Sequence, residues 1–170
     1  SAPDPDTMPE LLAAARAIQD DVVAIRRRIH RRPEVGLDLP QTQSVIIEEL
    51  AKLGLKGTKG HALSSVVPVI AGGRPGPTVL LRADMDALPL QEDTGLAFAS
   101  ETNGTMHACG HDTHVAMLLG AARLLQDRRA DLPGTVILMF QPGEEGVGGA
   151  QQVSDGAAIG GAGRESGQRE

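Results

Sequence analysis

The chain has 170 residues, of which 41% are hydrophobic and 22% are charged, the composition of an ordinary globular protein. Its net charge of −6 argues against a nucleic-acid binder, whose affinity would come from neutralising phosphates. A single cysteine excludes an internal disulfide and fits a reducing compartment, and no apolar run approaches the ~20 residues needed to span a bilayer. We therefore expect a cytoplasmic enzyme without membrane or nucleic-acid partners.

The first part of the chain predicts two helices. Residues 1–8 are expected to form a flexible leader. Apolar residues then recur at spacings of three and four over residues 11–29, which predicts one helix that ends before Pro33. A second helix is predicted over about 40–53. The arginines near the end of the first helix are interpreted as a solvated helix terminus, because cations there interact well with the helix dipole.

The middle of the chain predicts strands and a third helix. Segments 65–71 and 78–83 are typical of strands, and the Gly- and Pro-rich spacer between them predicts a hairpin. Residues 89–106 are expected to form an irregular loop, and 112–127 a helix with one buried stripe. The apolar run 135–140 is typical of a strand buried on both faces. This order of elements indicates an α/β layered fold with a mixed sheet.

The periodic pattern ends at about Ala150. Residues 151–170 contain five glycines and only two large aliphatic residues, a composition that predicts a disordered tail. The sequence therefore indicates a leader at 1–8, one catalytic domain at 9–150 and a Gly-rich tail at 151–170.

Residues 107–114 contain three of the five histidines and the only cysteine. Cys109 and His111 are two residues apart and cannot share a helix face, so we expect a loop that leads into a helix, with Gly110 allowing a tight bend. The positive end of that helix should lower the pKa of Cys109 and keep His111 neutral, and both effects favour metal binding. Asp112 is expected either to cap the helix or to hold a nitrogen of a histidine. A buried cysteine among helix-capping residues is the alternative.

Two acidic pairs follow predicted strands. Asp84 and Asp86 have the spacing that puts both carboxylates on one face of an extended chain, at a strand end, where α/β sheets bind ligands. Glu144 and Glu145 follow the last predicted strand and should point apart, one towards a metal ion and the other towards a water molecule. The alternatives are a helix cap or turn for the first pair and an exposed surface pair for the second.

Three motifs together resemble those of a known enzyme family. They are RADMDALP at 82–89, MHACGHD at 106–112 and FQPGEEG at 140–146. The chain is similar here to the metal-dependent amidohydrolases that include hippurate hydrolase, the indole-acetic-acid–amino-acid conjugate hydrolases and N-acetyldiaminopimelate deacetylase. These are related to the aminoacylase and carboxypeptidase metallopeptidases. The resemblance extends over roughly 10–150 and includes the helix end at 30–36.

The resemblance implies an α/β/α layered, zinc-peptidase-like catalytic domain. Such an enzyme hydrolyses the amide bond of N-acyl amino acids such as hippurate, with a metal-activated water and a glutamate as general base. It implies two divalent ions, Mn, Zn, Co or Ni, and a homo-oligomeric assembly.

Individual residues match roles in that family. Glu144 matches the general base, and Asp86 matches the acid that orients the metal site, with Asp84 as its rival. His107 and His114 are expected to support the site or the fold. The residues that match metal ligands are Cys109, His111 and Glu145.

The sequence departs from the family after the double glutamate. The family's remaining ligands are two later histidines, whereas no histidine follows His114. The resemblance ends at about Gly149, before the part of the family's sequence that forms the lid or dimerisation domain. We therefore expect an incomplete domain and hypothesise a truncated or frameshifted product. Three ligands suffice for one ion but not for a stable pair, which predicts weak or no turnover. The alternative function is an inactive fragment that binds at most one metal ion or acts as an interaction module through an open sheet edge.

Overall fold

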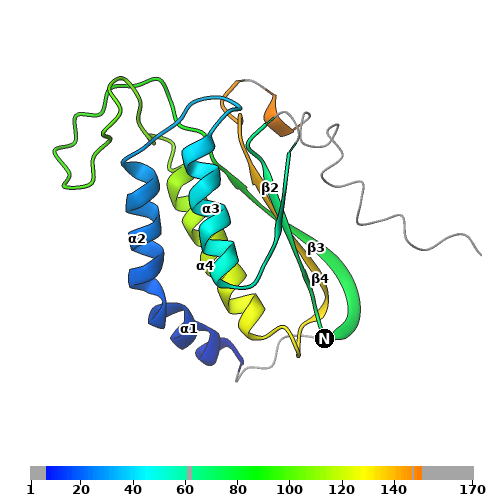
Figure 1. The fold of residues 1–170 in the computed structure, drawn as a ribbon. Helices are drawn as coiled ribbons and strands as arrows, with labels where there is room; N and C mark the ends of the chain where they lie inside the picture. Colours follow the sequence, from blue (N-terminus) through cyan, green and yellow to red (C-terminus); the bar gives the residue numbers. More distant parts are fainter. Residues whose placement is uncertain (1–6, 61–62, 147, 151–170) are drawn as a thin grey trace, which may run out of the picture.

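The computed structural model describes residues 7–60, 63–146 and 148–150 (Figure 1). The predicted tail at 151–170 and most of the predicted leader at 1–8 lie outside the described residues. None of the described helices is long and apolar enough to cross a membrane. The elements are α1 (Thr7–Ala17), α2 (Gln19–His30), α3 (Pro40–Lys52), β1 (Gly57–Lys59), β2 (Val66–Ala71), β3 (Arg74–Asp84), α4 (His111–Asp127) and β4 (Pro133–Gln141).

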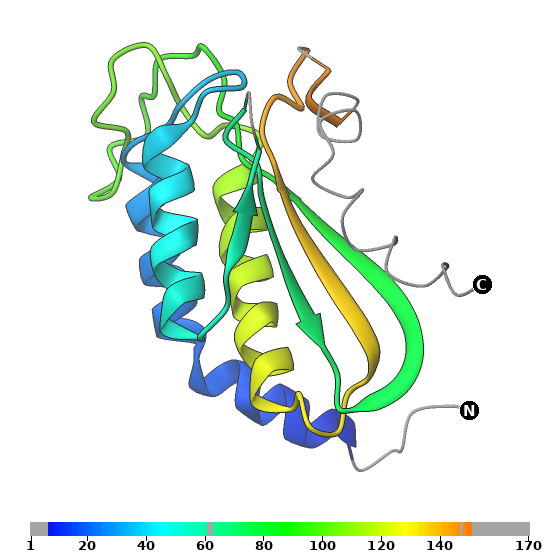
Figure 2. The ribbon, with the colours of Figure 1, turned by 45° about the vertical axis from the view of Figure 1, so that its right-hand side comes forward.

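A four-stranded mixed sheet forms one layer of the fold, with the strand order β1-β2-β4-β3. β4 pairs parallel with β3 and antiparallel with β2, and β2 pairs antiparallel with β1. Figures 1 and 2 show the described helices on one face of this sheet, with α3 and α4 next to it and α2 packed on α4. The predicted α/β layered fold with a mixed sheet is therefore confirmed.

The hairpin predicted between segments 65–71 and 78–83 is wrong. β2 and β3 are not neighbours, because β4 lies between them and pairs with both. Arg74–Pro77, interpreted as turn residues, belong to β3, which pairs with β4 from Arg74 onwards across a register shift. The apolar β4 takes the inner position because most of its side chains are buried. A turn-like spacer cannot reveal that a later strand is inserted between its two flanks.

The single helix predicted before Pro33 is divided into α1 and α2. Ile18 lies between them with φ −102° and ψ 3°, outside helical geometry. Its side chain is nevertheless buried. The apolar spacing therefore continues through the break, which explains why the sequence pattern reads as one helix. The predicted helices at 40–53 and 112–127 are confirmed within one residue at each end.

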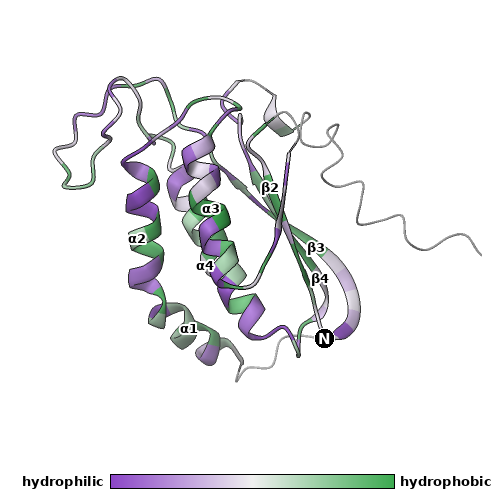
Figure 3. Ribbon diagram, in the orientation of Figure 1, coloured by the Kyte–Doolittle hydropathy of each residue, from purple (hydrophilic) through white to green (hydrophobic). Residues whose placement is uncertain are grey.

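The hydrophobic core lies between the helices and the sheet. Figure 3 shows apolar residues on α3, α4 and the strands, and polar residues along much of α2. Phe140 is fully buried in this cluster, and its other members are aliphatic or Met, as a chain with two aromatic residues requires. The largest fully buried side chains of the cluster are Phe140, Ile29, Leu39, Ile46, Leu50, Ile70, Met85, Leu138, Val66 and Val115.

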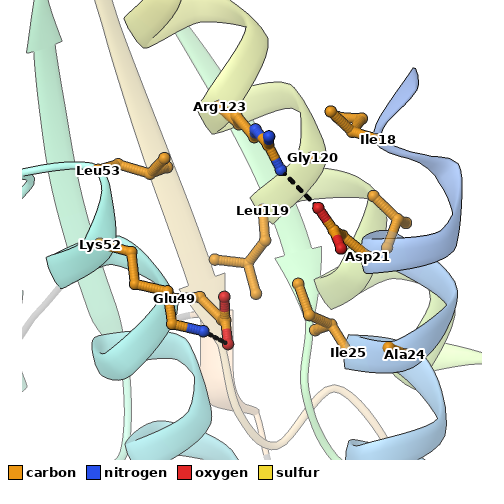
Figure 4. A pocket seen from close by; sticks show the side chains of 11 residues that line it. Ile18, Asp21, Ala24, Ile25, Glu49, Lys52, Leu53, Leu119, Gly120 and Arg123 are labelled. Atoms are coloured by element: carbon orange, nitrogen blue, oxygen red, sulfur yellow. Dashed lines mark hydrogen bonds and ion pairs between the residues drawn. The ribbon is translucent and has the colours of Figure 1, made fainter. Parts of the chain in front are cut away.

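A hollow of about 460 Å³ lies between α2, α3 and α4. Its wall is largely apolar, and its rim carries the ion pairs Arg123–Asp21 at 2.8 Å and Lys52–Glu49 at 2.6 Å (Figure 4). No residue of the three sequence motifs is among the described residues that line it. The fold therefore separates this hollow from the chemistry of the motifs.

The three motifs meet at the carboxyl end of the parallel strands. Asp84 at the end of β3 is in register with Gln141 at the end of β4, so the residues that follow each strand emerge side by side. The loop 85–110, closed by a bridge between Leu88 and Met106, then returns the chain to the start of α4 at this same end.

Candidate metal centre

His111 lies at the middle of the candidate site. It is the first residue of α4, directly after Gly110, whose φ of 89° is left-handed and gives the tight bend predicted from the sequence. The ring is buried, and its Nδ1 lies 2.8 Å from the backbone carbonyl oxygen of Asp86. Because that oxygen can only accept, Nδ1–H donates and Nε2 carries the free lone pair. Nε2 has no hydrogen-bond partner among the described residues.

Three carboxylates surround Nε2 of His111. The distances are 3.9 Å to Asp84 Oδ2, 3.8 Å to Glu144 Oε2 and 4.0 Å to Glu145 Oε1. These are too long for hydrogen bonds. A tetrahedral ion with bonds of about 2.0–2.2 Å holds two of its ligand atoms about 3.4 Å apart, so a small inward movement of the side chains would form a ligand set.

The described residues contain two groups of closely spaced candidate ligands, and both include His111. One group adds Glu144 and Glu145, and the other adds Asp84 and His114. In each group the ligand atoms lie within 4.8 Å of one another. The donor set of imidazole nitrogens and carboxylate oxygens is suited to divalent ions such as Zn²⁺, Mn²⁺ or Co²⁺.

Asp86, in the first motif, binds residues of the second and third motifs. Its side chain is buried, and its two carboxylate oxygens accept the backbone N–H of Glu144 at 3.0 Å and of Glu145 at 2.9 Å. Its carbonyl oxygen fixes the ring of His111. These contacts give a physical route for the orienting role predicted for Asp86, whereas its rival Asp84 faces His111 and His114.

Cys109 is exposed at the rim of the site. The interaction of its thiol with the Glu145 carboxylate, together with partial burial and the charges of nearby acids, raises the pKa of Cys109 to about 11. The lowered pKa predicted from the helix terminus is therefore wrong for the metal-free chain, because the carboxylates outweigh the helix dipole. Cys109 belongs to neither group of closely spaced candidate ligands, and its role as a ligand stays a prediction.

A buried ion-pair network supports the start of α4. Asp112 Oδ2 accepts from His30 Nδ1 at 2.8 Å and from Arg26 Nε at 3.0 Å, and His30 Nε2 lies 3.3 Å from Glu92. The side chain of Asp112 makes no helix-capping hydrogen bond. Two roles were predicted for Asp112, and the structure confirms that it binds a histidine. The histidine is His30, which is 82 residues away in the sequence. Because of this distance, the sequence alone could not reveal the pair.

His107 lies behind the metal centre and close to this network. Its side chain is buried, its ring centroid is 6.3 Å from that of His30, and neither ring nitrogen has a partner among the described residues. Burial lowers the pKa of His107 to about 4, although the negative charge of Asp112 opposes this shift. The imidazole is therefore neutral at neutral pH.

The structure thus brings most of the predicted site residues together. His114 was predicted only to support the site, yet its Nδ1 lies 3.6 Å from Asp84 Oδ2. The signal that could have found it is its spacing of three from His111 on the helix, which places both rings on one face. The predicted residues that gather around His111 are Asp86, Glu144 and Glu145, with Cys109 next to Glu145.

Comparisons with known proteins agree with this arrangement. A family model described as peptidase family M20/M25/M40 matches residues 80–166. The match continues into the segment for which a disordered tail is predicted. Thermostable carboxypeptidase 1 of Saccharolobus solfataricus is 46% identical over 92% of this chain, and N-acetylcysteine deacetylase of Bacillus subtilis is 41% identical over 87%.

A solved structure is also similar over most of the chain. The YXEP protein of Bacillus subtilis, described as a dinuclear metal binding peptidase from the M20 family, is 41% identical and covers 86% of this chain with a TM-score of 0.81. The chain in turn covers 41% of that structure, and 40% and 39% of the carboxypeptidase and the deacetylase. It therefore spans about two fifths of the length of the relatives that it matches.

We predict that Asp86→Asn weakens the fold around the metal centre. An amide offers one acceptor oxygen in place of two, so either Glu144 or Glu145 loses the partner of its backbone N–H. Loss of such a charge-assisted bond costs about 1–3 kcal/mol. Urea unfolding of the metal-free chain should show this loss, whereas the exposed control Asp93→Asn should stay within about 0.5 kcal/mol of the wild type. Equal effects of the two substitutions would contradict the prediction.

The buried His107 predicts an acid-dependent loss of stability in the metal-free chain. Its pKa of about 4 in the fold lies below the value of 6.5 for a free histidine, so the unfolded chain binds more protons between these pH values. The free energy of unfolding should therefore fall as the pH drops from about 6.5 towards 4, by roughly 1.4 kcal/mol per pH unit over the middle of this range.

His107→Gln isolates this contribution. Urea unfolding at pH 7 and at pH 4.5 should show that the wild type loses about 2–3 kcal/mol more than the variant, since only the wild type carries the buried titrating ring. If both proteins lose the same free energy, His107 is not held neutral by the fold.

Proposed function

Because the chain belongs to peptidase family M20/M25/M40, we propose that it forms part of an amidohydrolase that cleaves small N-acyl amino acids. Hippurate represents this substrate class. The names of two relatives support the proposal, since one is a deacetylase of N-acetylcysteine and the other a carboxypeptidase. The observation that carries it is the free Nε2 of His111, which faces the carboxylates of Glu144 and Glu145 at the end of the sheet.

We propose that Cys109, His111 and Glu145 bind a metal ion. We call this set of three ligands the thiolate position. A thiolate, an imidazole and a carboxylate together suit Zn²⁺, Co²⁺, Ni²⁺ or Mn²⁺, and three protein ligands leave a coordination position open for water or substrate. The effect of Glu145 on the pKa of Cys109 and the 4.0 Å separation of Glu145 and His111 support this grouping. Bound divalent metal, in one ion or two, would polarise the acyl carbonyl and make water more acidic.

Glu144 is the general base of the proposed reaction. Its side chain is 43% exposed, so it can reach a water molecule that enters from solvent. Its Oε2 lies 3.8 Å from His111 Nε2, and this proximity supports a role in activating a water molecule at the metal centre. Glu144 takes a proton from this water and passes it to the leaving amine. Asp86 keeps Glu144 and Glu145 at fixed backbone positions, which reduces the reorganisation needed during the reaction.

A metal-binding or interaction module without turnover is the second candidate function. The observation that favours it is the outer strand β3 of the described sheet, where Val79 and Leu80 are 48% and 43% exposed. An exposed apolar edge can pair with another chain. Turnover of a substrate separates the two functions, because a binding module would hold metal without releasing product.

We predict that the protein purified with Mn²⁺ or Zn²⁺ releases glycine from hippurate only weakly, because three ligands do not hold a stable metal pair, and that Glu144→Gln lowers this kcat by a further factor of about 10²–10⁴. Glutamine keeps the size of the side chain but cannot take the proton, so the bound metal should be unchanged. The matched control is Glu10→Gln, on the exposed surface of α1, which should retain wild-type kcat.

Two outcomes would change the proposal. Undiminished kcat in Glu144→Gln would contradict its role as the base. A wild-type protein that holds metal, measured by elemental analysis, but releases no product from any N-acyl amino acid would favour the binding module.

A further inference from the structure

We infer that a cleft at the edge of the sheet binds the C-terminal end of an extended peptide. This edge cleft has a volume of about 440 Å³ and lies beside the last residues of β2, between the segment that enters β1 and the end of α4. Ala71 of β2 pairs with Thr135, near the start of β4, whereas the metal centre lies at the other end of β4. The lining residues that can contact a ligand include Leu55, Lys56, Val69, Ala71, Gln126 and Arg129.

The edge cleft borders a stretch of β2 that β1 does not cover. β1 is the outer strand of the sheet, but it has three residues and pairs with β2 only over Val66–Pro68. The last residues of β2, Val69–Ala71, pair with β4 on one side and with no described strand on the other. An unpaired strand edge of this kind can accept an added strand.

The backbone of Ala71 faces the edge cleft. The N–H of Gly72 donates to the carbonyl of Gly134 at 2.8 Å, so the backbone groups of Gly72 point towards β4. Because successive residues of an antiparallel pair point their backbone groups to opposite sides, those of Ala71 point outwards. Nε of Arg129 donates to the outward carbonyl of Ala71 at 2.8 Å. The N–H of Ala71 has no backbone partner in the described part of the chain and can donate to a peptide carbonyl.

The shape of the edge cleft favours a chain end over a continuous strand. β1 meets β2 at the pair of Gly57 and Pro68, and this contact closes one end of the cleft. A peptide that pairs antiparallel with Ala71 runs in the same direction as β1, because β1 is also antiparallel to β2. Such a peptide has to stop where β1 begins, and the end that it presents there is its C-terminus.

The charges of the edge cleft favour a carboxylate at this point. Lys56 lies directly before β1, at the closed end, and Arg129 lies two residues after α4. The described lining contains these two cations and no Asp or Glu, although the chain as a whole has a net charge of −6. A C-terminal carboxylate would therefore meet cations without a competing acid among the lining residues.

The remaining lining fits the last residue of such a peptide. Leu55 and Val69 supply apolar contacts, and Val69 is 42% exposed in the absence of a ligand. Gln126 donates through Nε2 to the carbonyl of Leu53 at 3.2 Å, while its buried Oε1 has no hydrogen-bond partner in the described part of the chain. A peptide N–H that enters the cleft would satisfy this oxygen. The ligand is thus an extended peptide with an apolar last residue and a free carboxylate.

Fluorescence anisotropy with the peptide Thr-Val-Thr-Val, labelled at its N-terminus and carrying a free C-terminal carboxylate, tests the inference. The protein is kept metal-free with EDTA, so the metal centre does not take part. We expect saturable binding, at least tenfold weaker for the same peptide with a C-terminal amide. Lys56→Gln should weaken binding by a factor of about three to ten. The matched control Lys59→Gln, which removes an exposed cation of β1 outside the cleft, should retain the affinity.

Hydrogen exchange measured by NMR gives a second readout at the edge of β2. Bound peptide should slow the exchange of the Ala71 amide at least tenfold. The inference is overturned if the peptide does not bind at concentrations up to about 1 mM, or if the amide form binds as tightly as the carboxylate. Equal affinities of Lys56→Gln and Lys59→Gln, or unchanged exchange at Ala71, would also overturn it. None of these results depends on the proposed function, because the residues of the metal centre stay unaltered.

Discussion

The site depends on the contacts that the buried Asp86 makes with two other segments of the chain. Its carboxylate holds the backbone of Glu144 and Glu145, and its carbonyl holds the ring of His111. Asp86 follows β3, the glutamates follow β4, and His111 begins α4, so a single residue fixes the relative positions of the three motifs. A buried carboxylate with both oxygens satisfied is stable in this place, because its charge is compensated by donors that cannot move away.

The same contacts leave His111 in an orientation that suits the proposed metal-binding role. A histidine that donates through Nδ1 to a carbonyl has its tautomer and its ring plane fixed, and Nε2 is then the only nitrogen left for an ion. Around that nitrogen the fold gathers carboxylates at distances of 3.8–4.0 Å. Carboxylates this close together repel one another when no cation is bound. The distances are close to those between the ligand atoms of a metal ion. The same carboxylates raise the pKa of Cys109. A thiolate next to the negative charge of Glu145 is unfavourable unless a cation lies nearby.

Much of the fold and part of the site could be predicted from local patterns. The helix at 112–127, the apolar strand at 135–140 and the left-handed bend at Gly110 follow from residue spacing and conformational preference, and the structure agrees with them. Strand order could not be predicted, because the insertion of β4 between β2 and β3 depends on burial across the whole sheet. The pair of His30 and Asp112 was equally inaccessible, since these residues are 82 positions apart and meet only when α2 packs on α4.

We propose that the end of the sheet is a divalent metal centre built around His111. Titration calorimetry of Zn²⁺ into the wild-type protein and into His111→Ala tests this most directly, because both groups of closely spaced candidate ligands include His111. We expect at least one Zn²⁺ bound per wild-type chain and a loss of affinity of more than about 100-fold in the variant, larger than the loss for a supporting residue. Equal affinities in the two proteins, or no binding to the wild type, would contradict it.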